Sequence, residues 1–252
     1  MNDLEGRRPL KTRSWRVFQY AAERLAQTRV TPNMISTSSM VFGVIAGLAL
    51  AGTSMAGSSG VLAILYLAAA GCMQLRLIAN LLDGMVAVEG GKASPVGVLY
   101  NEVPDRLSDV AILIGAGYSL ASRAELGLAA AVVAVFVAYI RAIGSSAGAG
   151  EVFVGPMAKP QRMALMTFAC VLCALLSLTS SGLSGRWQAP VMGAVLGLII
   201  VGGVITSVRR LMIISETLRA QMRRPMEFPA DEFPADELPA DDRAPAESAQ
   251  GE

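Results

Sequence analysis

The stretch NLLDGMVAVEGGKASPVGVLYNEVPDRLSD, from Asn80 to Asp109, places seven charged side chains between two long apolar segments. An ionisable side chain at membrane depth is costly, so its presence there marks a candidate for function. We therefore expect this stretch to join two membrane spans and to hold the chemical site of the protein.

Outward from this stretch the chain is apolar over most of its length. Of its 252 residues, 53% are hydrophobic and 16% are charged, which is typical of a protein that crosses the membrane several times. At about 20 residues per crossing, we expect an all-α integral membrane protein. Its six predicted spans are 34–54, 60–83, 98–121, 125–147, 160–180 and 189–212. Two pairs of small residues, Gly43 with Gly47 and Gly193 with Gly197, predict close helix packing in the first and sixth spans.

The composition divides the chain into four regions. These are a basic, mobile N-terminus at 1–13, an interfacial amphipathic helix at 14–30, a six-span transmembrane domain at 31–215 and a disordered, acidic, proline-rich tail at 222–252. The helix is predicted by apolar residues spaced three and four apart, although a soluble surface helix is an alternative. The tail repeats the unit EFPAD, which argues against a packed structure.

Basic residues predict the orientation in the membrane. Lysine and arginine gather before the first span and after the sixth, whereas the opposite side has only Arg123 and Arg186. We therefore expect a protein of the plasma or inner membrane. Both termini, and the loops after spans two and four, should face the cytoplasm. No cleavable signal peptide is expected, because the first thirty residues are basic and lack an apolar core.

Several kinds of chemistry are excluded by composition. Histidine is absent, so it serves neither as general base nor as metal ligand. The cysteines, Cys72, Cys170 and Cys173, lie in apolar stretches and are interpreted as packing residues. No nucleic-acid partner is expected.

Oxygen-bearing side chains recur at helical spacing in the opening stretch. Asn80 and Asp83 are three residues apart at the end of the second span, and Asn101 and Asp105 are four apart at the start of the third. Asp109 continues the second face by one turn, so each set shares one side of its helix. Two such faces would bring together the ligands that magnesium or manganese prefers, often beside a substrate phosphate.

These residues resemble the signature of the CDP-alcohol phosphatidyltransferases, D-x2-D-G-x2-A-R-x8-G-x3-D-x3-D. Without a gap, it maps onto Asn80, Asp83, Gly84, Ala87, Val88, Gly97, Asn101 and Asp105. The segments TPN at 31–33, YIRA at 139–142 and KPQR at 159–162 are also similar to the family. The resemblance covers roughly residues 14–215. It implies six transmembrane helices, a surface helix, a homodimer and a site that faces the cytoplasm.

The resemblance also implies a reaction in phospholipid biosynthesis. An alcohol would attack the lipid-side phosphorus of a CDP-linked lipid such as CDP-diacylglycerol, and CMP would leave; a phosphorylated polyol is the favoured acceptor. Asp105 would be the catalytic base. Mg²⁺ or Mn²⁺ would bind Asn80, Asp83, Asn101 and Asp105. The residues implied for CDP binding are Asn33, Arg76, Gly84, Ala87, Ser94 and Gly97, and those for the acceptor's phosphate are Arg141, Lys159 and Arg162.

Three positions depart from the signature. Asn80 and Asn101 stand where it has acids, and Val88 where it has arginine. An amide oxygen ligates metal without bringing negative charge, so one ion or two remains open. Arg76, one turn before Asn80, is predicted to supply positive charge to the diphosphate; the alternative is a structural partner for an acid or a helix-end carbonyl. Gln161 also replaces a common acid, which bears on the acceptor.

A family member that binds CDP-lipid or lipid without turnover is the main alternative, because two acids have become amides. The basic residues of the acceptor set would, alternatively, anchor the protein to lipid headgroups. A prenyltransferase would normally have more spans and two aspartate-rich regions, and no internal repeat supports a transporter.

Overall fold

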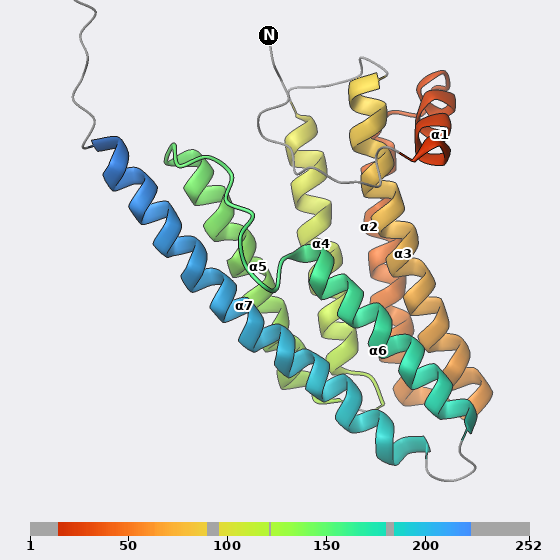
Figure 1. Ribbon diagram of the computed structural model, residues 1–252. Helices are drawn as coiled ribbons and strands as arrows, with labels where there is room; N and C mark the ends of the chain where they lie inside the picture. Colours follow the sequence, from red (N-terminus) through yellow and green to blue (C-terminus); the bar gives the residue numbers. More distant parts are fainter. Residues whose placement is uncertain (1–14, 90–95, 121, 180–183, 223–252) are drawn as a thin grey trace, which may run out of the picture.

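The computed structural model describes residues 15–89, 96–120, 122–179 and 184–222, and the described residues contain helices and no strand. The helices are α1 (Arg16–Ala26), α2 (Pro32–Gly52), α3 (Ser59–Glu89), α4 (Gly97–Gly117), α5 (Ala124–Ser146), α6 (Lys159–Thr179) and α7 (Ser184–Met222), with a 3₁₀ turn at Thr53–Met55 after α2 (Figure 1). The all-α prediction is confirmed. The predictions of a mobile N-terminus and a disordered acidic tail fall outside the described residues.

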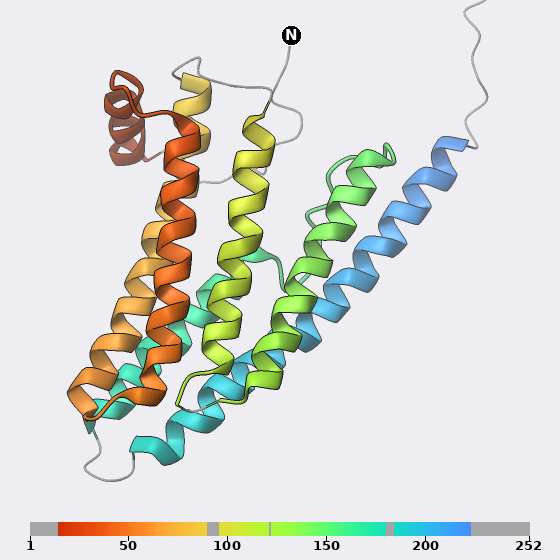
Figure 2. The ribbon, with the colours of Figure 1, turned by 180° about the vertical axis from the view of Figure 1, so that it is seen from behind.

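The long helices form one bundle. Helix α2 packs against α3 and α4, α3 against α6, and α5 against α4 and α7, while α6 also contacts α7. Figure 2 shows the same bundle from behind, with α2, α3 and α4 side by side and the α5–α7 pair beyond α4. A single apolar cluster joins α2 to α7. Cys170 and Cys173 are free and buried in it, and the partly buried Cys72 packs against it, as predicted for packing residues.

Five segments of the described chain are long and apolar enough to cross a membrane: Pro32–Met55, Ser59–Val88, Ala124–Ser146, Lys159–Thr179 and Val191–Met222. These segments identify an integral membrane protein. Helix α4 is not among the five, because it carries four charged residues, Glu102, Asp105, Arg106 and Asp109. It nevertheless runs alongside the others in the bundle (Figure 1). The prediction of six spans is thus supported for five, and α4 is the proposed sixth.

The predicted N-terminal helix is present as α1, and its apolar side packs against α3. Phe18, Ala22 and Leu25 pack against the end of α3 around Met85. The helix lies at the bundle end where α3 stops and α4 starts (Figure 1). Trp15, Val17 and Tyr20 are exposed, which suits a membrane interface, but that location stays a prediction.

Glycines let α2 and α4 approach at backbone distance. A Cβ on Gly47 would lie 2.3 Å from the carbonyl oxygen of Ala111, and one on Gly115 would lie 2.1 Å from that of Gly47. A Cβ on Gly43 would lie 2.5 Å from Cβ of Ser108. Close packing at the first glycine pair is therefore confirmed. For the pair in α7 it is wrong at Gly197, whose Cβ position has no described atom within 4 Å.

Candidate active site

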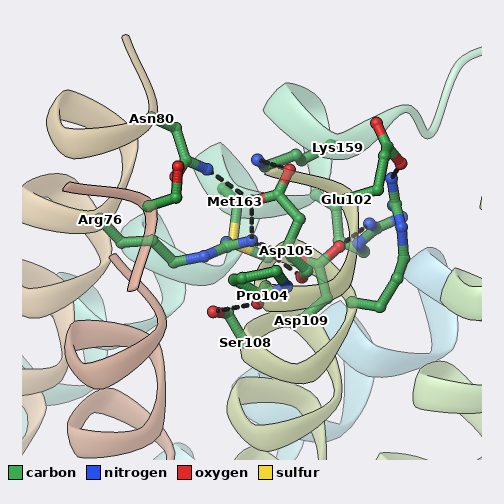
Figure 3. A network of polar contacts seen from close by, with 12 residues as sticks. Arg76, Asn80, Glu102, Pro104, Asp105, Ser108, Asp109, Lys159 and Met163 are labelled. Carbon is green, nitrogen blue, oxygen red and sulfur yellow. Dashed lines mark hydrogen bonds and ion pairs between the residues drawn. The ribbon is translucent and has the colours of Figure 1, made fainter. Parts of the chain in front are cut away.

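Asp105 of α4 is the centre of a network that joins three helices. Its Oδ1 accepts a hydrogen bond from Asn80 Nδ2 at 2.5 Å and one from Arg76 Nη2 at 3.2 Å, both from α3. Its Oδ2 is ion-paired with Lys159 Nζ at the first residue of α6. Figure 3 shows the three side chains pointing toward the Asp105 carboxylate. The predicted convergence of the α3 and α4 faces is confirmed.

Asp109 lies one turn deeper on the same face of α4. Its Oδ1 is 2.8 Å from Arg76 Nη2, and its Oδ2 is ion-paired with Arg162 of α6. Arg76 also donates to the carbonyl oxygen of Asp105 at 3.1 Å and contacts the sulfur of Met163 at 3.2 Å. Arg76 thus bridges two carboxylates from beneath Asp105.

Burial makes these ion pairs structurally necessary. The side chains of Arg76, Asp109 and Arg162 are 0%, 2% and 2% exposed. Removing one partner of a buried pair leaves an uncompensated charge, which typically costs about 3–5 kcal/mol. The network therefore holds the orientation of Asp105, while Lys159, with 23% of its side chain exposed, is the more accessible of its charged partners.

Asp83 has a different environment from Asp105. It is buried, and its Oδ2 accepts a hydrogen bond from Ser36 Oγ of α2 at 2.6 Å. Ser36 Oγ also lies 3.1 Å from the carbonyl oxygen of Pro32, at the start of α2. The N-terminus of α2, capped by Thr31, thereby positions Asp83. Sequence reasoning missed Ser36, because one of four consecutive hydroxyl residues, Ser36, Thr37, Ser38 and Ser39, carries no signal of its partner.

The residues assigned to metal do not form one cluster. Asn101 is exposed, whereas Asp83 and Asp105 are buried, and Asn80 is bonded through its amide nitrogen. Within the described ranges, no three acidic or cysteine side chains are grouped as a metal site. Both oxygens of Asp105 and Oδ2 of Asp109 are bonded to or ion-paired with nitrogen donors, and Asp109 Oδ1 lies 2.8 Å from Arg76 Nη2 with no hydrogen bond among the described residues. These residues do not fit a centre of two divalent ions.

The basic residues assigned to the acceptor also have acidic partners. Arg141 Nη2 is 2.5 Å from Glu102 Oε1, Arg141 Nη1 is 3.4 Å from Glu151 Oε1, and the guanidinium lies 5.7 Å from the centre of the Phe153 ring. Glu102 is ion-paired with Arg106 as well. Glu102, to which the sequence pattern assigns no role, connects Arg141 to α4, the helix that carries Asp105.

The residues assigned to CDP lie near one end of the bundle, where α2 starts, α3 ends and α4 starts (Figure 1). Asn33, Gly84, Ala87 and Gly97 are half-buried there, and Ser94 lies outside the described residues. Arg76 is different, because it is fully buried and bonded to Asp105 and Asp109. Its burial favours the alternative role of a structural partner for an acid.

Helix α7 holds the segment 154–157, which precedes Lys159, through two hydrogen bonds. Thr206 Oγ1 accepts a hydrogen bond from Met157 N at 3.0 Å, and Arg210 Nε donates to the carbonyl oxygen of Val154 at 3.0 Å. Gly155 has φ of +132°, and a Cβ there would lie 2.3 Å from Thr206 Cγ2. Only glycine combines that backbone conformation with so close a neighbour.

The fold of this chain is similar to that of solved structures of another protein. No family profile and no curated sequence matches the chain. Among solved structures, the phosphatidylinositol phosphate synthase PgsA1 of Mycobacterium tuberculosis with CDP-DAG bound is similar, with a TM-score of 0.63 and 21% identity over 79% of this chain and 94% of that one. The chain has the fold of phosphatidylinositol phosphate synthase.

Two further structures of PgsA1 agree. The complex with manganese and citrate has a TM-score of 0.61 and 21% identity over 79% of this chain and 88% of that one. The apo form has a TM-score of 0.59 and 22% identity over 78% of this chain and 95% of that one. The resemblance predicted from the signature is therefore confirmed at the level of the PgsA1 fold.

Proposed function

We propose that this protein is a CDP-alcohol phosphatidyltransferase, which transfers the phosphatidyl group of a CDP-linked lipid to an alcohol and releases CMP. The observation that carries the proposal is Asp105, held by α3 and α6 at the signature spacing. The PgsA1 fold supports it, because PgsA1 has been solved with CDP-DAG bound.

Asp105 would act as the general base. The alcohol oxygen forms a bond to the lipid-side phosphorus, the bond from that phosphorus to the CMP oxygen breaks, and the alcohol proton passes to the Asp105 carboxylate. A carboxylate within reach of the hydroxyl suffices for this transfer. Arg76 and Asn80 hold Oδ1, so Oδ2, which faces the accessible Lys159, is the oxygen assigned to the proton.

Mg²⁺ or Mn²⁺ would add to the positive charge that Arg76, Lys159 and Arg162 already supply. PgsA1 has been solved with manganese, and the signature acids are ligands suited to Mg²⁺ or Mn²⁺. Here Lys159 is positioned to bind a phosphate oxygen when it leaves Asp105, and Arg141 to bind the acceptor after exchange with Glu102 or Glu151. No step above is routed through a metal ion.

A panel of candidate acceptor alcohols tests this function. Purified protein in detergent is incubated with CDP-diacylglycerol and single alcohols, among them glycerol 3-phosphate and inositol phosphate, with and without Mg²⁺ or Mn²⁺. We expect one acceptor to increase CMP formation and to yield a new phosphatidyl lipid. Binding of CDP-diacylglycerol without CMP from any acceptor would favour the second candidate, a binding protein, which the amides Asn80 and Asn101 make a specific alternative.

Replacing Lys159 or Arg141 by Ala should raise the apparent KM for the acceptor far more than that for the CDP-lipid. Loss of a charge-assisted contact typically costs about 1.5–3 kcal/mol, which is roughly ten- to a hundredfold. Steady-state kinetics with each substrate varied in turn measures both values. Arg123→Ala, at the opposite end of α5 from Arg141, is the control and should change neither. Equal effects on both substrates would indicate a structural role instead.

We also propose the membrane arrangement that the sequence predicts. Six spans include α4, both termini and the site face the cytoplasm, and the protein is a homodimer. The five apolar segments support the spans, and the position of Asp105, two turns into α4, favours a site near the membrane boundary. The test is a fusion after residue 252 to a reporter enzyme that is active only outside the cytoplasm. Activity of that reporter would contradict this orientation.

A further inference from the structure

We propose that the Arg76 guanidinium, which pairs with both Asp105 and Asp109, opposes the binding of a divalent ion at Asp105, so that the native site binds such ions weakly. Arg76 is 0% exposed, and a single nitrogen, Nη2, lies 3.2 Å from Asp105 Oδ1 and 2.8 Å from Asp109 Oδ1. One positive charge therefore already lies between the two carboxylates.

The charge balance of the site supports this. Among the described residues, Asp105 and Asp109 are paired with three cations, Arg76, Arg162 and Lys159. The negative charge of these two carboxylates is therefore balanced without any ion. A divalent ion binds carboxylate oxygens directly, so at Asp105 Oδ1 it would have to displace Arg76, which is buried and would lose its partner.

The amide at position 80 belongs to the same arrangement. Asn80 lies one turn from Arg76 on α3, and its Nδ2 donates to the same Asp105 Oδ1 at 2.5 Å. An aspartate there would bring a second carboxylate against Asp105 and repel it, whereas the amide donates a hydrogen bond. Arg76 and Asn80 therefore both donate to Asp105 from this face of α3, where a carboxylate at position 80 would instead attract a cation.

This inference deepens the proposed function and rests on Asp105 being its centre. The fixed cation would hold Asp105 and Asp109 in place permanently, while Lys159 remains accessible to the diphosphate. Mn²⁺ binding measured in the absence of substrate tests the inference. The result does not depend on turnover, so the inference can fail while the proposed activity stands, and the reverse.

Mn²⁺ binding to purified protein is measured by the free-ion signal in electron paramagnetic resonance. Four proteins are compared: wild type, Arg76→Met, Arg76→Lys and the double variant Arg76→Met, Asn80→Asp. We expect Arg76→Met to bind Mn²⁺ roughly ten- to a hundredfold more tightly than wild type, the double variant more tightly still, and Arg76→Lys like wild type. Mn²⁺ should also raise the Tm of Arg76→Met more than that of wild type.

Gln74→Met is the matched control, because Gln74 also lies on α3, two residues from Arg76, but donates to Thr167 Oγ1 of α6 and to none of the site carboxylates. It should leave Mn²⁺ affinity unchanged. Two Mn²⁺ ions bound tightly by wild type would overturn the proposal, and so would a folded Arg76→Met protein with no gain. Should Arg76→Met fail to fold, the wild-type titration decides alone, since weak binding or none is the predicted result.

Discussion

Asp105→Asn is expected to abolish CMP release while part of the CDP-lipid binding survives. The amide keeps the shape of the side chain but accepts no proton, and general-base catalysis typically contributes roughly 10²–10⁴-fold in rate. The amide also leaves Lys159 and Arg76 with one negative charge fewer. The measurement is CMP formation by the purified variant at saturating donor and acceptor, with donor binding measured in parallel.

Stability must be separated from chemistry in this experiment. Asp109→Asn is the control, because it removes a buried carboxylate from the same network and the same Arg76. If both variants lose stability but only Asp105→Asn loses turnover per folded molecule, the loss is chemical. Full activity in a folded Asp105→Asn protein would contradict the assigned mechanism.

Gly47→Ala and Gly115→Ala are expected to lower the stability of the bundle strongly. In each case the new Cβ would lie within 2.3 Å of a main-chain oxygen of the facing helix, and overpacking of this kind typically costs about 1–3 kcal/mol or more. Because backbone atoms cannot rotate away as a side chain does, α2 and α4 would have to separate. Thermal unfolding in detergent measures the change in Tm.

Gly197→Ala supplies the comparison for these variants. Its Cβ has no described atom within 4 Å, so the same substitution in a helix should leave the Tm unchanged or raise it slightly, since alanine favours helix. The ranking of the three variants is the prediction. A Tm for Gly47→Ala equal to that for Gly197→Ala would show that α2 and α4 do not approach at backbone distance.

Helical periodicity predicted much of this arrangement because it is a local property. Asn80 is three residues before Asp83, and Asp105 four residues before Asp109, so each pair shares a face whatever the rest of the chain does. The signature spacing then identified the two faces that meet. The contacts from Asn80 and Arg76 to Asp105 confirm that they do.

The cations opposite those faces could not be paired from sequence. Lys159 and Arg162 meet Asp105 and Asp109 only because α6 begins where α7 holds the preceding segment through Thr206. That contact joins residues 49 apart in sequence, and one threonine in an apolar span gives no sign of it. The sequence accordingly predicted these cations as acceptor ligands but not their ion pairs.

Exposure of individual side chains was the other quantity that sequence did not determine. Asn101 shares its helix face with Asp105 but lies one turn closer to the start of α4, where it is exposed. Arg76 was assigned to CDP by its helix face, yet it is deep enough to be fully buried. A helix face gives direction around the axis, whereas depth depends on which neighbouring helices cover each turn.

The central claim, transfer of a phosphatidyl group to an alcohol oxygen, is tested most directly by following that oxygen. The acceptor identified in the panel is labelled with ¹⁸O at its attacking hydroxyl and incubated with CDP-diacylglycerol and wild-type protein. Mass spectrometry should find ¹⁸O in the product lipid and none in CMP, because the new bond is formed to the lipid-side phosphorus. Label in a cytidylyl ester of the acceptor, or phosphatidic acid without the acceptor as the sole lipid product, would contradict the account.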